Sequence, residues 1–119
     1  STTYFEPFHV ARVFQTLDLM SNGRAAWNVV TSLNDGEAAN MGHAEMMAHD
    51  TRYDRADEFV EVVLRHWDSW EDDALIVDKA TGRFGDGHKV HRLDFRGKFL
   101  SSRGTFTVPR SPQGRPVLI

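Results

Sequence analysis

The longest stretch with a single hydrophobic period runs from residue 49 to residue 70. Its apolar side chains recur three and four positions apart, so they form one stripe on an α-helix, and charged residues occupy the other face. The stripe comprises Tyr53, Ala56, Phe59, Val60, Val63, Leu64 and Trp67. Asp50 stands where an N-cap is expected, and acidic residues in the first turns suit the helix dipole. The pattern therefore predicts a long amphipathic helix that begins near residue 49.

A second helical pattern begins at Pro7, because proline is favoured at the first position of a helix. Asn22 and Gly23 end it, since glycine readily takes the positive φ found after a helix C-terminus. Before this helix, residues 1–5 have the character of the end of a β-strand. The predicted apolar stripe of the helix comprises Val10, Val13, Phe14, Leu17 and Met20.

Two further segments have the pattern of strands buried in a parallel sheet. Residues 24–32 are nearly continuous in apolar side chains, which predicts burial on both faces, and residues 117–119 begin another such strand. Asn28 interrupts the first run. A buried amide needs hydrogen-bond partners, so Asn28 either ties down neighbouring backbone or points at a ligand, and the sequence leaves both alternatives open.

Between the long helix and the last strand, the pattern changes to short antiparallel strands. Residues 74–77 predict a strand, and residues 81–87 are rich in turn formers. Residues 90–95 alternate with period two and would pair with residues 98–102 in a hairpin. The order β-α-β-loop-α-hairpin-β fits an α/β fold of successive right-handed βα units. We expect residues 1–119 to form a single partial domain, an internal segment of a longer protein whose ends cut through strands.

Composition narrows the classes of function. A net charge of −3 provides no general basic field for nucleic acid. Cysteine is absent, so a disulfide framework, a thiolate metal site and a thiol nucleophile are excluded. Apolar runs of bilayer length and a signal peptide are also missing from the sequence. We therefore expect a cytoplasmic protein with neither a membrane nor a nucleic acid as partner.

The start of the long helix holds the most promising side chains. His49 and Tyr53 are four positions apart and can share one helix face. Together with Arg52 they would suit a phosphate group at the helix N-terminus. The alternative, which spacing alone favours, makes His49 an exposed cap residue, Arg52 a solvated charge and Tyr53 the first core residue. The six histidines lack the paired spacing of zinc enzymes, so no metal site is expected.

Several motifs run in register with one family. They are Ser-Thr-Thr-Tyr-Phe-Glu-Pro at 1–7, Gly-Arg-Ala-Ala-Trp-Asn-Val-Val-Thr-Ser at 23–32, His-Asp-x-Arg-Tyr at 49–53, Trp-Asp-Ser-Trp at 67–70 and Pro-Arg-Ser-Pro-Gln-Gly-Arg-Pro at 109–116. On these residues the chain resembles the flavin-dependent monooxygenases of the bacterial luciferase-like superfamily. The branch it resembles contains nitrilotriacetate monooxygenase component A, dibenzothiophene-sulfone monooxygenase and long-chain alkane monooxygenase.

The resemblance implies a partial (β/α)8 TIM barrel, with about two βα units plus a β-hairpin insert, and FMN at the C-terminal ends of the strands. It implies a two-component oxidoreductase in which a flavin reductase supplies reduced FMN, which uses O2 to oxygenate a small organic substrate. A homo-oligomer is expected. The FMN-binding residues that the resemblance implies are Thr2, Thr3, Asn28, His49 and Tyr53, with Arg52 a weaker candidate.

The resemblance identifies no catalytic residue in this chain, and it places further FMN contacts of the family outside residues 1–119. We therefore expect the isolated chain to be inactive even if its parent is a monooxygenase. The alternative is a truncated, non-catalytic fragment that folds or assembles without binding flavin, because a partial barrel exposes strand edges that must be paired.

Overall fold

The computed structural model describes residues 1–119, and two long helices carry most of its regular structure. The helices are α1 (Pro7–Met20), α2 (Asp35–Asn40), α3 (His49–Trp67) and the 3-10 helix η1 (Gly87–Lys89). The strands are β1 (Ala26–Trp27), β2 (Leu75–Asp78), β3 (Arg83–Gly85), β4 (Phe95–Arg96), β5 (Ser101–Ser102) and β6 (Val117–Leu118). None of the helices is long and apolar enough to cross a membrane.

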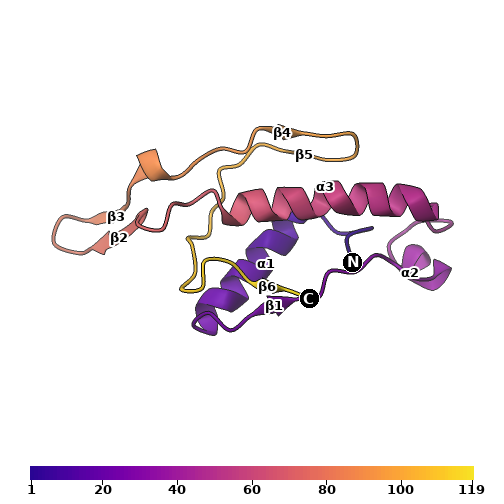
Figure 1. The fold of residues 1–119 in the computed structure, drawn as a ribbon, viewed down its shortest axis with the longest axis horizontal. Coiled ribbons are helices and arrows are strands. Elements are labelled where there is room, and N and C mark those ends of the chain that lie inside the picture. Colours follow the sequence, from indigo (N-terminus) through magenta and orange to yellow (C-terminus); the bar gives the residue numbers. More distant parts are fainter.

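Helix α3 runs along the length of the molecule and separates two β structures (Figure 1). The β1–β6 pair and α1 lie on one side of α3, and the β4–β5 hairpin lies on the other. The β2–β3 hairpin projects past the C-terminal end of α3. Strands β1 and β6 are parallel, with Ala26 opposite Val117 and Trp27 opposite Leu118. This is the strand–helix–strand arrangement that the hydrophobic pattern predicted, because parallel neighbours need a long crossover.

Both predicted ends of α1 are confirmed, but its predicted apolar stripe is wrong in part. The helix begins at Pro7, and Asn22 and Gly23 follow it with φ angles of 57° and 78°. Val13, Leu17 and Met20 are exposed, whereas the buried residues are Pro7, Ala11, Gln15 and Asp18. The reason is that periodicity shows which face is apolar, while burial depends on what covers that face. Here β1, α3 and residues 109–116 cover the other side of the helix.

The core lies where α1, β1 and α3 meet. Trp27 of β1 packs against Phe59 and Trp67 of α3, with ring centroids 6.2 and 5.9 Å apart. The buried indole of Trp67 donates to the carbonyl of Ala11 at 3.0 Å, and that of Trp70 donates to the carbonyl of Phe106 at 2.9 Å. Each large ring therefore buries its apolar surface and still satisfies its N–H, which makes this junction rigid.

The segment 109–116, hereafter the tail, is anchored on the buried carboxylate of Asp18. This carboxylate accepts hydrogen bonds from the backbone N–H of Ala25 at 2.9 Å and from the side chains of Ser111 and Gln113. Gln15 donates to the carbonyl of Pro109 at 3.0 Å. A buried carboxylate is tolerated when its oxygens are hydrogen-bonded. Because Asp18 also holds the turn before β1, it places β6 beside β1.

The strand predictions at the edges of the chain need correction. Residues 2–4 form a turn, so the strand predicted at residues 1–5 is absent. The strand predicted at 24–32 is regular only over Ala26–Trp27 and is not buried on both faces. Side chains from Ala26 to Val30 alternate between exposed and inward-facing, because helices cover one face of β1 and nothing in the structure covers the other.

The antiparallel segment from β2 to β5, residues 75–102 and hereafter the excursion, contains two hairpins where one was predicted. The first pairs β2 with β3, so the segment predicted only as turns contains a strand. The second pairs β4 with β5, which confirms a hairpin at the predicted place, although its strands are only two residues long. The longer strand predicted at residues 90–95 is replaced by an isolated bridge between Val90 and Trp70. After α3, the chain therefore runs outward through the β2–β3 hairpin and then comes back beside α3 in the β4–β5 hairpin (Figure 1).

Candidate functional site

The turn at residues 2–4 runs beside the end of β1. The N–H of Thr2 donates to the carbonyl of Val30 at 2.8 Å, and the N–H of Ser32 donates to the hydroxyl of Thr3 at 3.0 Å. Both threonines are buried, with exposed fractions of 1% and 3%. The two hydroxyls differ, because Thr3 Oγ1 accepts a hydrogen bond from the backbone whereas Thr2 Oγ1 has no hydrogen-bond partner. Of the two predicted threonines, Thr2 is the one whose hydroxyl is entirely unpaired within the chain.

Arg55 holds this turn against α3. Its guanidinium donates to the carbonyl of Thr2 and, at 3.3 Å, to the carbonyl of Phe5. The side chain also lies over the ring of Phe59, 5.7 Å from its centroid. Desolvation by burial lowers the pKa of Arg55, although the charges of Glu6 and Glu58 oppose that shift. The helical pattern placed Arg55 on the solvated face and gave no signal of this role.

His49 and Tyr53 share one face at the start of α3, as their spacing predicted. Their ring centroids are 4.7 Å apart, and His49 Nδ1 lies 2.8 Å from a carboxylate oxygen of Asp50. Both side chains are exposed, and Tyr53 is 51% exposed. The N-cap position is occupied by Ala48 rather than Asp50. Asp50 instead lies in the first turn, beside the positive end of the helix dipole.

The alternative assignments for Arg52 and Tyr53 are both wrong. Arg52 is buried, with 6% exposure, and donates to the carbonyl of Met47 at 3.3 Å, while its Nε has no partner. Tyr53 is exposed and does not begin the core. The buried face of α3 is therefore rotated about the helix axis relative to the predicted stripe. Its buried residues are Arg52, Phe59, Val62, Val63, His66 and Trp67.

Thr2 and Tyr53 meet at one hollow of about 360 Å³. Val29, Val30 and Val60 give it a largely apolar wall. His49 reaches this group through its contact with the ring of Tyr53. The structure thus brings Thr2, Tyr53 and His49 close together. Their hydroxyl, phenol and imidazole groups lie beside the apolar side chains of the three valines.

Asn28 lies at a second hollow, of about 420 Å³, between β1 and α1. Its side chain is exposed and makes no hydrogen bond, so the alternative in which it ties down neighbouring backbone is wrong. Phe5, Val13 and Phe14 supply apolar wall to this hollow. Asn28 and the Thr2–Tyr53–His49 group therefore occupy separate hollows along the same short strand.

Comparisons with known proteins agree on one family. A family model described as luciferase-like monooxygenase matches residues 1–119. The chain is 59% identical over 119 residues to dibenzothiophene-sulfone monooxygenase of Rhodococcus erythropolis, covering 100% of this chain and 26% of that protein. It is 49% identical to nitrilotriacetate monooxygenase component A of Aminobacter aminovorans, again covering 100% and 26%. The solved structure of a riboflavin lyase with modified FMN and riboflavin superposes with a TM-score of 0.91 at 46% identity, covering 99% of this chain and 26% of that one.

The parallel strand pair with its covering helices is part of a luciferase-like (β/α)8 barrel, which confirms the predicted fold class. The chain belongs to the luciferase-like monooxygenase family, which confirms the resemblance found in its motifs. It spans about a quarter of the length of the relatives it matches. The structure also explains one of those motifs, since Ser111 and Gln113 of the tail bind Asp18.

Proposed function

We propose that this chain is a segment of an FMN-dependent, two-component monooxygenase and that it carries part of the FMN site. One observation supports this most directly: Thr2, whose buried hydroxyl has no hydrogen-bond partner, lines the same hollow as the exposed Tyr53. An unsatisfied buried polar group costs about 1–3 kcal/mol, so a ligand that hydrogen-bonds Thr2 would recover that free energy. The riboflavin lyase of the same fold was solved with modified FMN.

The donor groups of this neighbourhood fit a flavin nucleotide. Thr2, His49 and Tyr53 can hydrogen-bond its polar atoms, and Asn28 offers an amide from the adjacent hollow. Thr3 can still donate its O–H to a ligand, and its bond from Ser32 also fixes the backbone that carries Thr2. Arg52 is a weaker candidate, because it does not line the Thr2–Tyr53 hollow.

When bound in its reduced form, FMN supplies the reaction with O2, and this chain contributes binding and environment. The valine side chains of the Thr2–Tyr53 hollow would exclude water from that face of the site, which strengthens each polar contact. The proposal includes a flavin reductase as partner, a small organic substrate and a homo-oligomer. The relative from Aminobacter aminovorans, named as a component A, supports the two-component part. No residue of this chain is assigned to catalysis.

The sharpest test is a chimera of the Rhodococcus erythropolis relative. In this chimera, residues 1–119 of this chain replace the segment of the relative that is 59% identical to them. We expect the chimera to bind FMN and the change His49→Ala to weaken binding by about 1–3 kcal/mol, the range for a lost charge-assisted hydrogen bond. Affinity is measured by flavin fluorescence under anaerobic, reducing conditions and by calorimetry with oxidised FMN.

His88→Ala is the matched control, because His88 is an exposed imidazole of η1 outside the proposed site. A folded chimera that binds no FMN, or one in which His49→Ala leaves the affinity unchanged, would contradict the proposal. Titrating the 119-residue chain alone shows whether these residues suffice. The second candidate, assembly without flavin, is favoured by the exposed Val13, Leu17 and Met20, and it predicts association of the chain that FMN does not alter.

A further inference from the structure

Positive charge is concentrated in the excursion. Residues 87–104 hold five cationic side chains and one carboxylate, a net charge of +4, although the whole chain carries −3. The cations are Lys89, Arg92, Arg96, Lys98 and Arg103. Two of them are neutralised within the chain, since Lys89 pairs with Asp73 and Lys98 lies 3.7 Å from Asp54. Arg92, Arg96 and Arg103 make no ion pair.

The β4–β5 hairpin is held firmly on α3 by its inner side. The carboxylate of Glu58 accepts from the N–H groups of Lys98, Phe99 and Leu100 at 2.7, 2.9 and 3.1 Å. Ser102 Oγ lies 2.8 Å from His66 Nε2. The guanidinium of Arg65 lies over the ring of Phe95, 5.3 Å from its centroid. Phe95 and Ser102 therefore face α3, and the hairpin is a fixed element rather than a free loop.

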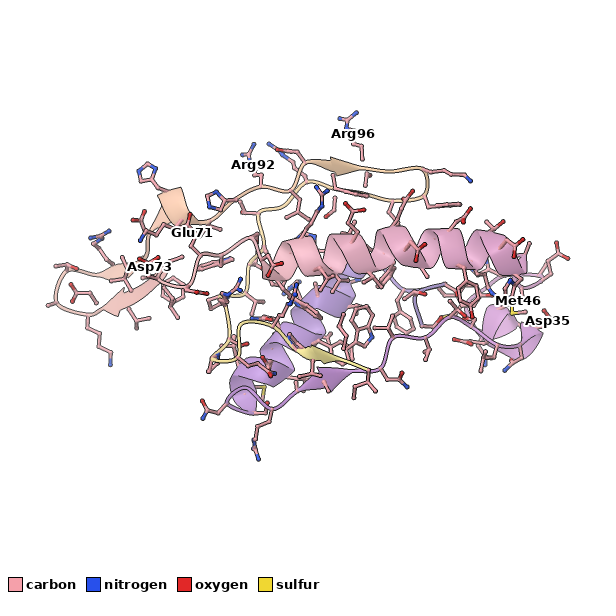
Figure 2. All side chains as sticks on the ribbon, viewed as in Figure 1. Asp35, Met46, Glu71, Asp73, Arg92 and Arg96 are labelled. Carbon is pink, nitrogen blue, oxygen red and sulfur yellow. The ribbon has the colours of Figure 1, made fainter.

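The register then orients the remaining cations. Phe95 is opposite Ser102, and Arg96 is opposite Ser101. Because successive side chains of a strand point to opposite faces, Arg96 and Ser101 point away from α3, and Arg103 shares their face. Figure 2 shows Arg92 and Arg96 directed outward from the molecule. A polar hollow of about 660 Å³ lies along the hairpin, and its wall holds two cations, Arg96 and Arg103, and one carboxylate, Asp94.

We propose that this outer face of the β4–β5 hairpin, with Arg92, Arg96 and Arg103, docks a protein surface that bears carboxylates. Guanidinium groups recognise carboxylates in a bidentate geometry. The face also lies on the side of α3 away from the β1–β6 pair (Figure 1), which is the outer side of a barrel because barrel helices form its outer ring. The negative charge of the rest of the chain disfavours a long polyanion such as nucleic acid. The inference is independent of the proposed flavin site.

The test uses the whole chain and a fluorescently labelled hexaglutamate peptide at low ionic strength, where surface charges are little screened. We expect saturable binding that the pair Arg96→Gln/Arg103→Gln weakens roughly tenfold, given the usual strength of exposed ion pairs. The matched control is Lys79→Gln/Arg83→Gln, which also removes two unpaired, exposed cations, but from the β2–β3 hairpin. This control pair should leave the affinity within about twofold of the unmodified chain.

Each other outcome overturns the proposal. Equal weakening by both pairs would show a general effect of net charge, and absence of saturable binding would show that the face has no affinity for carboxylates. Tighter binding of an oligothymidylate, lost in the Arg96→Gln/Arg103→Gln pair, would identify a nucleic-acid face instead. Self-association of the chain at low salt, abolished by the same pair, would make a second copy the occupant.

Discussion

At the scale of single residues, His66 shows how burial changes the pKa of a side chain. Its side chain is fully buried between the rings of Phe8 and Phe106, with both centroids 5.2 Å away. Nε2 lies beside the hydroxyl of Ser102, and Nδ1 has no partner. Since an unpaired acceptor costs less than an unpaired N–H, we assign the tautomer in which Nε2 donates to Ser102. Desolvation by burial lowers the pKa of His66 to about 4.

This pKa predicts how stability depends on pH. In the unfolded chain His66 titrates near 6.5, so between about pH 6.5 and pH 4 the unfolded chain binds a proton that the folded chain does not. The free energy of unfolding should be highest above pH 6.5 and should fall by up to roughly 3 kcal/mol as the pH drops to 4. Urea unfolding at a series of pH values measures this slope. His66→Gln should flatten it and the exposed His9→Gln should not; an undiminished slope in His66→Gln would refute the assignment.

At the scale of elements, local signals located the helices but not the sides they bury. Pro7, Gly23 and the 3.6-residue period set the bounds of α1 and most of α3, because these signals act within one or two turns. The same period could not show that α3 buries Arg52 and leaves Tyr53 exposed. Nor could it show that Glu58, on the face predicted to meet water, binds the hairpin. The Glu58 contact depends on a segment about 40 residues away in the sequence.

The Glu58 contact gives a prediction for the hairpin as an element. Desolvation raises the pKa of Glu58, but the N–H groups of Phe99, Lys98 and Leu100 outweigh it, so the pKa is lowered on balance. Glu58→Gln should therefore speed hydrogen exchange of these three amides, by roughly tenfold, because the amide side chain is a weaker acceptor.

Gly97→Ala should have the same effect, since a Cβ at Gly97 would overlap a Glu58 carboxylate oxygen and displace the carboxylate. The control is Glu61→Gln, which removes only the exposed pair with Arg65. Equal exchange rates in Glu58→Gln and the unmodified chain would show that other contacts hold the hairpin on α3.

At the scale of the whole molecule, the β2–β3 hairpin projects away from the core. The molecule is elongated, with extents of 55, 29 and 22 Å, and the β2–β3 hairpin forms one end of its length (Figure 1). This hairpin exposes Leu75, Ile76, Val77 and Phe84. Its base is closed by a hydrogen bond of 2.8 Å from the N–H of Asp86 to the carbonyl of Ala74. The core at α1, β1 and α3 does not depend on its tip.

Replacing residues 76–84 by an Asn-Gly turn should therefore leave the free energy of unfolding within about 0.5 kcal/mol, as for surface changes away from packed groups. Leu75 and Gly85 are already paired, so a short turn can join them. Urea unfolding followed by circular dichroism measures the change. A loss of cooperative unfolding would mean that the hairpin contributes to the core after all.

The sequence by itself determined the two long helices, the parallel β1–β6 relationship, a hairpin within residues 90–102 and the family. These follow from local propensity, from the period of apolar residues and from motifs that can be recognised without knowing which segments pack against one another. Only the tertiary structure decided that the Thr2 hydroxyl is unpaired while that of Thr3 accepts a hydrogen bond from Ser32, that Asn28 is exposed, and that Asp18 anchors the tail. The physical reason is that a pattern records which side chains avoid water, whereas burial and pairing depend on which distant segment packs against them.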